Sequence, residues 1–456
     1  MYFVIFLVAI NLFKLATARF FPLIGDEAYY WLWSQHLDLS YVDHPPMIAY
    51  VNHLLTFLFG QNEMAVRLGA ILIVLLISWI IYLTGRALHG ERFGQLSAVL
   101  FNLVPTFFGG GMFLVPQTVL FLFWSLSFYL MVKLIKTGKS YYWYLLGLSA
   151  GLGLLSDYVM ALFFVGTVVY CAVNKEQRYW LTRKEPYLAV LLSLLIFSPV
   201  LLWNLRLGFT PLFYWGGKMG AGPRIGDNLL NFFGLQMLLY TPPVFFLTFY
   251  LIFKGKDLLA KLYAAAVFLP FLLISPLINV GGHWPSTSYL PALIEISRSK
   301  KWVIWTMVGF ALFVNSVGFA YYLWLYPTPA ELKGKEFTIN QQLPQFIKDS
   351  APKTGRTWVF ANDLGMVGLV TFHGKTRAYM APGRLKQVDL WGKPELQKGD
   401  NIIYFALNET PLYDKLKLSF RKVWIEPNKR IFNKDANLPT LTQIYHAAGY
   451  KGGLIP

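Results

Sequence analysis

The amino-acid sequence predicts a polytopic α-helical membrane protein with a small α/β domain outside the membrane. Hydrophobic residues make up 56% of the 456 residues and charged residues only 14%, with a mean hydropathy of +0.47. A soluble chain is about one-quarter charged, so this composition argues against a soluble protein. Apolar runs of membrane-spanning length recur up to about Pro327. After Pro327, Lys and Arg occur throughout residues 328–456 and no such run remains.

Hydropathy predicts about eleven transmembrane helices within residues 1–327. The predicted spans are 2–19, 64–84, 94–110, 116–134, 141–155, 157–173, 187–203, 228–253, 258–278, 286–297 and 301–326. The fifth and sixth could instead form one bent segment. No basic segment precedes the first apolar run, so the first span is expected to be retained and not cleaved as a signal peptide.

Basic residues in alternate loops predict the orientation of the chain. Lys and Arg are concentrated in the loops 86–94, 133–142, 174–186, 253–261 and 297–301. Positive charge in short loops marks the cytoplasmic side of a membrane protein. The opposite loops, which include a first external loop at 20–63 and a later one at 204–227, are therefore expected to face outward. An odd number of spans puts residues 328–456 on the same outer side.

Short alternating pieces predict the fold of the outer domain. The segments "TWVFAN", "NIIYFAL" and "KLSFRKVWIE" are rich in strand-forming residues. The intervening "DLGMVGLVTF" has the composition of a helix. Residues 328–456 are therefore predicted to form a soluble α/β domain.

Several polar residues are expected to converge on the outer face. The first external loop, "GDEAYYWLWSQHLDLSYVDHPPMIAY", contributes Asp26, Glu27 and Asp43. Gln117 begins a predicted span at the same level, and Asp157 lies at a junction between two spans. Ionisable groups at the membrane boundary are costly and commonly functional. The alternative is that the acidic residues are merely solvated and that the aromatic loop lies along the bilayer surface.

These stretches carry a family resemblance. The segment "GDEAYYWLWSQHL…YVDHPPMIAY" resembles the first-loop signature of membrane glycosyltransferases that use polyprenyl-phosphate sugars. This group includes the protein O-mannosyltransferases and the aminoarabinose transferase of lipid A. "GLGLLSDYVMAL", "SPVLLWNLRLGF", "GGHWPSTSYLPAL" and "GRLKQVDLWG" agree with it. The resemblance implies a GT-C-type fold.

The resemblance also implies roles for residues of the first loop. Asp26 matches the catalytic carboxylate of the family, and Glu27 completes the acidic pair. Asp43 and His44 match a turn whose acidic residue is a metal-ligand candidate and whose basic residue contacts the lipid phosphate. The family often has lysine where this chain has His44.

Two positions depart from the family pattern. Relatives commonly show Thr-Pro-Asp where this chain has Val115-Pro116-Gln117, and Leu-Ser-Lys-Tyr where it has Leu155-Ser156-Asp157-Tyr158. Both positions are expected on the outer face, so the departures suggest a different sugar or acceptor.

The remaining candidate residues fall into two groups. Arg67, Lys218 and Arg224 are candidate ligands of the donor phosphate, although Arg67 could instead form a helix pair with Glu63. The sugar and acceptor pocket is predicted to contain Tyr29, Tyr30, Gln117, Asp157, Tyr158, His283 and Trp284.

The predicted function is inverting transfer of a sugar from a polyprenyl-phosphate donor to an envelope acceptor at the periplasmic face of a bacterial inner membrane. The net charge of +17 suits an anionic acceptor, such as lipid A or another glycolipid. A protein acceptor is the alternative within this class, and a lipid or solute transporter is the alternative from another class. A transporter should place an ionisable group within the membrane, for which Lys14 is the main candidate. No nucleic-acid partner is expected and no cofactor is certain; a divalent metal at Asp43 stays open.

Overall fold

The computed structural model divides the chain into two compact units. It describes residues 2–18, 23–209, 225–320, 336–381, 387–407, 412–426, 430–435 and 438–453. Unit 1 consists of Met1–Ala18, Asp38–Ile48 and Arg67–Phe319. Unit 2 consists of Arg19–Leu37, Ala49–Val66 and Ala320–Pro456.

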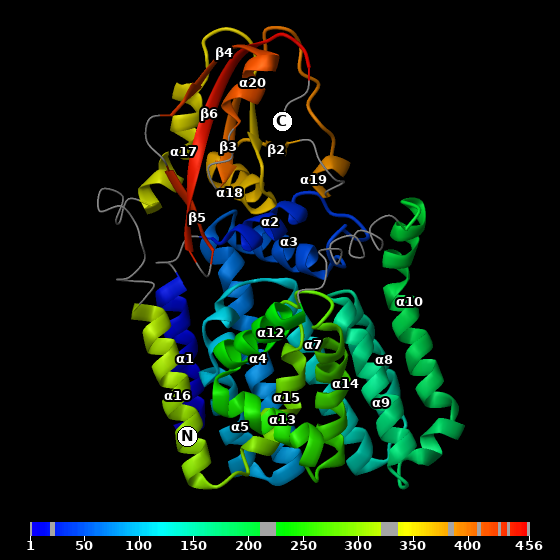
Figure 1. The fold of residues 1–456 in the computed structure, drawn as a ribbon. Helices are drawn as coiled ribbons and strands as arrows, with labels where there is room; N and C mark the ends of the chain where they lie inside the picture. The colour runs from blue at the N-terminus through cyan, green and yellow to red at the C-terminus, as the bar shows by residue number, and fades with distance from the viewer. Residues whose placement is uncertain are drawn as a thin grey trace. The chain divides into compact units, whose positions relative to one another are not determined.

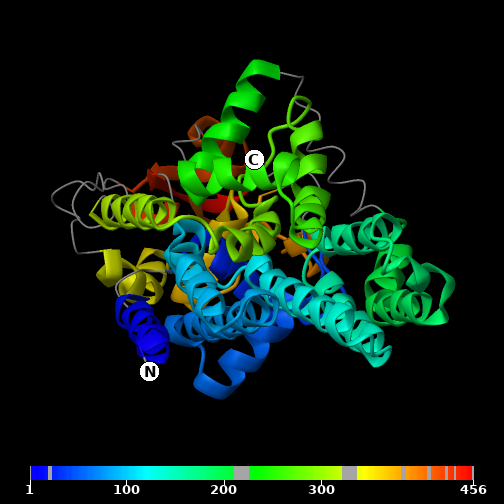
Figure 2. The same cartoon turned by 90° about the horizontal axis from the view of Figure 1, so that it is seen from below.

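Unit 1 is built from helices (Figure 1 and Figure 2). They are α1 (Tyr2–Ala18), α4 (Glu63–His89, from Arg67 onward), α5 (Glu91–Leu103), α6 (Pro105–Phe108), α7 (Pro116–Thr137), α8 (Tyr141–Leu154), α9 (Ala161–Val173), α10 (Lys184–Arg206), α12 (Ile225–Tyr240), α13 (Pro242–Lys254), α14 (Leu258–Ile274), α15 (Tyr289–Ile296) and α16 (Lys301–Ala320). Four short 3-10 helices are η1 (Gly110–Met112), η2 (Tyr158–Met160), η3 (Arg178–Thr182) and η4 (Ser286–Ser288). Helix α8 packs against both α7 and α10, and α9 packs against α14.

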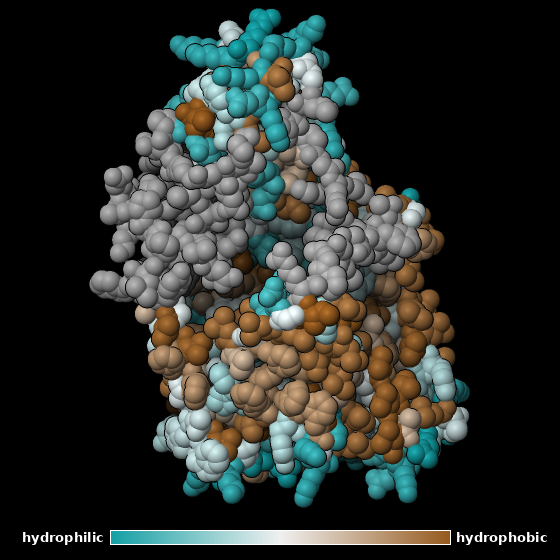
Figure 3. Space-filling view, viewed as in Figure 1, coloured by the Kyte–Doolittle hydropathy of each residue, from teal (hydrophilic) through white to brown (hydrophobic). Residues whose placement is uncertain are grey.

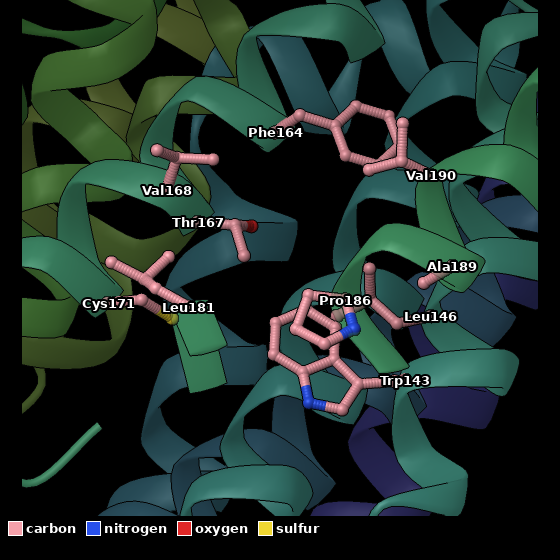
Figure 4. A pocket seen from close by; sticks show the side chains of 10 residues that line it. All are labelled: Trp143, Leu146, Phe164, Thr167, Val168, Cys171, Leu181, Pro186, Ala189 and Val190. Carbon is pink, nitrogen blue, oxygen red and sulfur yellow. The ribbon is translucent and has the colours of Figure 1, made fainter. Parts of the chain in front are cut away.

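Unit 1 has the surface of a membrane protein. In the described part of the chain, α4, α7, α10 and α16 are long and apolar enough to cross a bilayer, and α12 with α13 would make a fifth such span. Large apolar side chains on α10 and α16 are exposed, including Leu195 and Trp305. Figure 3 shows a broad hydrophobic surface over these helices and a hydrophilic lower end. A broad apolar surface of this kind suits contact with the hydrocarbon core of a bilayer, because lipid tails are themselves apolar.

Several predicted spans have different boundaries in the structure. The predicted span 94–110 ends at Leu103, because Pro105 cannot continue the helix and starts the short α6. The predicted span 228–253 is wrong as a single helix: α12 and α13 meet at a bend of 112°. Thr241 at this bend has φ of 68°, and Pro242 opens α13. The predicted spans 141–155 and 157–173 are separate elements, α8 and η2 with α9.

Two buried cations hold the start of unit 1 together. The Lys14 ammonium, fully buried, donates to the Phe107 carbonyl oxygen at 3.0 Å. The guanidinium of Arg67, which is 1% exposed, donates to the Ala18 carbonyl oxygen at 2.5 Å and lies 5.7 Å from the Phe113 ring centre. Buried charges need such partners, and both of these join α1 or its end to another segment.

Unit 2 contains a mixed sheet with the order β2-β1-β3-β6-β4, and β5 pairs with β6. The strands are β1 (Thr357–Ala361), β2 (Ala378–Met380), β3 (Asn401–Leu407), β4 (Phe420–Ile425), β5 (Arg430–Asp435) and β6 (Leu438–Tyr450). β1 is parallel to β2 and β3, whereas β6 is antiparallel to β3, β4 and β5. The strands expected in "TWVFAN", "NIIYFAL" and "KLSFRKVWIE" are therefore observed.

The helices of unit 2 come from both ends of the chain. They are α2 (Gly25–Ser34), α3 (Met47–Phe59, in unit 2 from Ala49), α17 (Glu336–Ser350), α18 (Leu364–Gly374), α19 (Gln387–Leu390) and α20 (Tyr413–Ser419). α18 connects the parallel strands β1 and β2 and packs against α2. At their contact, a Cβ added to Gly368 would lie 2.5 Å from the Ala28 carbonyl carbon. The segment expected to be a first external loop thus contains α2 and α3, and α2 packs against α18 of the C-terminal α/β segment.

Candidate functional site

A cavity in unit 1 contains many of the residues singled out in the sequence. It has a volume of about 160 Å³. Its lining residues are Asp43, His44, Gln117, Leu120, Asp157, Tyr158, Val159, Phe271 and Trp284. Six of these are predicted site residues, and they come from four separate stretches of sequence.

Asp157 is the centre of the polar contacts in this cavity. One oxygen, Oδ2, lies 3.5 Å from His44 Nδ1 and accepts a hydrogen bond from Gln117 Nε2 at 3.2 Å. The other oxygen, Oδ1, accepts from the Val159 backbone N–H at 2.9 Å and caps η2. The side chain of Asp157 is only 8% exposed. A carboxylate this buried is stabilised by such partners, so the side chain has a fixed position.

The two departures from the family pattern therefore contact each other. According to the predicted resemblance, Gln117 replaces an acidic residue and Asp157 replaces a lysine. The structure joins them through the hydrogen bond from the Gln117 amide to the Asp157 carboxylate.

The loop that carries Asp43 and His44 is held on both sides by hydrogen bonds within unit 1. The Met47 backbone N–H donates to the Leu155 carbonyl oxygen at 2.9 Å, next to the Asp157 junction. Asp38 is exposed and accepts a hydrogen bond from Trp203 Nε1 at 2.9 Å. These contacts fix the loop relative to α8 and α10.

A second loop brings His283 and Trp284 toward the cavity. Gln236 on α12 is buried and donates to the Gly282 carbonyl oxygen at 3.0 Å. Trp284 lines the cavity, and its ring lies 5.9 Å from that of Phe271. Burial lowers the pKa of His283, the Asp157 carboxylate opposes this change, and His44 adds to it. His283 is therefore within electrostatic reach of the cavity although it does not line it.

Asp26 and Glu27 lie in unit 2, in the first turn of α2. Asp26 is exposed, whereas Glu27 is fully buried. Glu27 Oε2 accepts a hydrogen bond from the Ile24 backbone N–H at 3.1 Å, so it helps to cap the helix. Carboxylates are favoured at this end because the helix N-terminus carries partial positive charge. The pair thus divides into a buried residue that helps to cap the helix and a residue that is exposed at the helix start.

Tyr29 and Tyr30 are mostly buried in unit 2. They are 4% and 8% exposed, and both rings make edge contacts with Trp33, at centroid distances of 5.2 Å and 5.0 Å. Contact with Trp33 is therefore a structural role for both side chains. Their predicted contact with sugar or acceptor stays a prediction.

The predicted phosphate ligands that the structure describes lie in different places. His44 lines the cavity, whereas Arg67 does not line it and donates to the Ala18 carbonyl oxygen. Lys218 and Arg224 lie outside the described residues. As to a metal at Asp43, no group of three or more His, Cys, Asp or Glu side chains with a metal-binding arrangement occurs in the described ranges.

Sequence reasoning missed the apolar part of the cavity. Leu120, Val159 and Phe271 line it, but each lies in an apolar run where nothing in the sequence distinguishes it from a core or lipid-facing residue. Val159 could have been predicted as a pocket residue, because it directly follows Asp157-Tyr158 in the motif "GLGLLSDYVMAL".

Comparison with known proteins gives one family match and several relatives. Residues 43–203 match the family model described as dolichyl-phosphate-mannose-protein mannosyltransferase. The lipid A galacturonosyltransferase RgtD of Rhizobium johnstonii is 24% identical over 283 residues, which is 59% of either chain. An undecaprenyl phosphate-alpha-4-amino-4-deoxy-L-arabinose arabinosyl transferase of Erwinia tasmaniensis is 32% identical over 137 residues. That match covers 29% of this chain and 25% of the relative, so the chain spans only part of these two relatives.

A solved structure resembles the chain over nearly its whole length. The crystal structure of ArnT from Cupriavidus metallidurans bound to undecaprenyl phosphate has a TM-score of 0.68 and covers 97% of each chain, at 15% identity. This likeness confirms the predicted helical membrane fold of the GT-C type. Together with the family match and the sequence relatives, it confirms the predicted resemblance of this chain to the membrane glycosyltransferases that use polyprenyl-phosphate sugars.

Proposed function

We propose that this protein is an inverting glycosyltransferase that moves a sugar from a polyprenyl-phosphate donor to a glycolipid of the bacterial envelope. The observation that carries the proposal is the cavity of unit 1. There, Asp43 and His44 of the first-loop motif meet Asp157 of a second motif and Trp284 of a third. Motifs shared with one enzyme family that converge on one cavity point to a common site for substrate.

The donor is a sugar joined through one phosphate to a long polyprenol. The relatives support this class, since one of them is named for undecaprenyl phosphate-linked aminoarabinose and ArnT was solved with undecaprenyl phosphate. His44 is the proposed phosphate ligand within the cavity, with Arg67, Lys218 and Arg224 as further cations. Positive groups near the phosphate would stabilise the charge that develops as it leaves.

Asp26 is the proposed general base. It would take the proton of the acceptor hydroxyl, whose oxygen then attacks the anomeric carbon as the phosphate departs on the opposite side. A single displacement inverts the anomeric configuration, and a positioned base contributes roughly 10²–10⁴-fold to the rate. The exposure of Asp26 at a helix start suits this role, and the buried Glu27 would hold the helix start in place.

The cavity of unit 1 is the proposed sugar pocket. It presents Asp157 with Gln117 and His44 as fixed neighbours, and Tyr158 and Trp284 as aromatic walls. His283 would act at its rim. The Asp157 carboxylate would favour a donor sugar with hydroxyl or amino groups over a sugar that itself carries a carboxylate, because like charges repel.

The proposed acceptor is lipid A or a related anionic glycolipid at the periplasmic face of the inner membrane. Its support is the relative that acts on lipid A and the net charge of +17. A protein acceptor is the second candidate, favoured by the family match to protein mannosyltransferases. The domain division proposed with this function is a catalytic membrane part at 1–327 and an outer part at 328–456.

The test is transfer by the purified protein in detergent, with polyprenyl-phosphate sugars and lipid A as substrates. Wild type should form a glycosylated lipid A detected by mass spectrometry, and Asp26→Asn should form none while keeping its thermal stability. A transporter would show no turnover, because a micelle has no separate compartments. Transfer to peptide but not to lipid A would favour the protein acceptor. Wild-type turnover by Asp26→Asn would remove Asp26 from the mechanism.

A further inference from the structure

One arginine in unit 2 is held in place by carbonyl oxygens and a ring, and it has no acidic partner among the described residues. Arg377 precedes the edge strand β2 and is exposed. Its Nη2 donates to the carbonyl oxygens of Trp391 and Gly392 at 2.5 Å and 3.3 Å, and its guanidinium carbon lies 4.9 Å from the Tyr379 ring centre. No Asp or Glu of the described ranges forms an ion pair with it.

A second arginine on the same sheet shows what a purely structural partner set looks like. Arg356 also lies over an aromatic ring, 5.3 Å from the centre of Trp358. Unlike Arg377, it forms two hydrogen bonds with the Asp400 carboxylate, at 3.2 Å and 2.9 Å. Asp400 therefore compensates the charge of Arg356, whereas the charge of Arg377 is immobilised but not compensated by a described carboxylate.

The surroundings of Arg377 include a histidine from the other end of the chain. The imidazole of His36 stacks on the Trp391 indole at a centroid distance of 4.5 Å and an angle of 21°. Burial lowers the pKa of His36, and the positive charge of Arg377 lowers it further. Trp391 thus connects the two groups, since its carbonyl oxygen accepts a hydrogen bond from Arg377 and its ring stacks on the His36 imidazole. A bound anion would oppose the effect of Arg377 on the pKa of His36.

We propose that Arg377, His36 and Trp391 form a binding site for a phosphate monoester on the outer face of unit 2. The guanidinium has N–H groups left beyond Nη2, and Arg matches the oxygens of a phosphate group in a planar arrangement. Its side chain is already ordered by two carbonyls and a ring, so little conformational entropy is lost on binding. The Trp391 indole fixes the position of the His36 ring beside it.

One further exposed cation lies close in sequence to Arg377. Lys375 is exposed two residues before Arg377. Lys393 is close in sequence to Trp391, but it pairs with Asp389 at 3.1 Å. The phosphate could belong to a phosphorylated saccharide headgroup or be free phosphate, and the chemistry of recognition is the same. The site does not depend on the proposed transfer reaction, because binding to unit 2 requires no donor.

The experiment measures binding by the full-length protein in an uncharged detergent, by calorimetry at pH 7 and low salt. The ligands are glucosamine 1-phosphate, inorganic phosphate and glucosamine. Arg377→Gln should weaken binding of glucosamine 1-phosphate roughly ten- to hundredfold, which is the effect of losing a charged hydrogen-bond partner. Arg377→Lys keeps the charge and should lose less. Lys422→Gln is the matched control, because Lys422 is an exposed cation 5.5 Å from the Trp424 ring on the opposite edge strand.

A second readout follows the His36 ring by NMR with histidine-selective labelling and His36→Asn for assignment. Bound phosphate should raise the pKa of His36 in wild type and not in Arg377→Gln. Tighter binding of glucosamine 1-phosphate than of inorganic phosphate would identify a saccharide headgroup as the source, and equal binding would identify free phosphate. The proposal fails if neither phosphate compound binds, if glucosamine binds equally well, or if Lys422→Gln weakens binding as much as Arg377→Gln. None of these results bears on transfer activity, which the Asp26 variant tests separately.

Discussion

The contact between α2 and α18 predicts a large effect of one added methyl group. In Gly368→Ala, the new Cβ would lie 2.5 Å from the Ala28 carbonyl carbon and 2.6 Å from the Tyr29 nitrogen. Both atoms belong to the backbone, so no side chain can move aside, and the helices must separate by about 1 Å to reach van der Waals distance. Overpacking of this kind costs about 1–3 kcal/mol or more. The gain in helix propensity from Gly to Ala offsets about 1 kcal/mol of it.

The expected net destabilisation is about 1–2 kcal/mol, which corresponds to a fall of roughly 2–8 °C in melting temperature for a domain of this size. The assay is thermal unfolding of the purified protein at one fixed scan rate, since membrane proteins unfold irreversibly. Gly309→Ala is the control, because a Cβ at Gly309 meets nothing within 4 Å. It should keep or raise the melting temperature. A Gly368→Ala variant as stable as Gly309→Ala would refute the close backbone contact.

Three further predictions follow from the structure. Asp157→Ala should lower thermal stability more than Asp157→Asn, because Asn retains an oxygen for the Val159 N–H and a lost cap costs about 0.5–2 kcal/mol. Both variants should reduce sugar transfer. Equal melting curves for the two variants would count against the capping role. Burial lowers the pKa of His373 to about 4, so the unfolded chain binds this proton more readily and stability should fall as pH drops from about 6.5 toward 4. His373→Gln should reduce that dependence between pH 7 and pH 5, and an unchanged slope would assign it to other groups. Cysteine labelling of intact cells should reach positions in 336–381 but not in 174–186, and the reverse pattern would invert the predicted orientation.

The membrane fold and much of the cavity could be predicted from local sequence. Hydropathy located α4, α7, α10 and α16, because lipid contact requires long apolar runs. Motif residues such as His44 and Asp157 could be assigned to one site because the spans alternate in direction and bring their outer ends to one side. Their contact at 3.5 Å was not predictable, since it depends on how the 40–48 loop crosses the end of α8.

Other features depend on contacts between distant segments. The bend at Thr241 needed a positive φ that a Thr-Pro-Pro sequence does not specify. The neutral-looking Gly365 and Gly368 gave no sign that they face Gly25 and Ala28. From the sequence, Arg67 could be a phosphate ligand or could form a helix pair with Glu63. In the structure it is buried and donates a hydrogen bond to the Ala18 carbonyl oxygen, which is a structural contact.

The packing of α2 against α18 also determines when α2 can complete its folding during synthesis. The two helices are more than 300 residues apart in the sequence. At a synthesis rate of 5–20 residues per second, α2 would leave the ribosome roughly 15–60 s before α18 exists. During this interval Tyr29, Trp31 and Trp33, which are buried in the finished protein, lack their final partner helix. α2 therefore reaches its final packing only after the chain has been synthesised as far as α18, and a chain truncated before Leu364 would leave α2 without this partner helix.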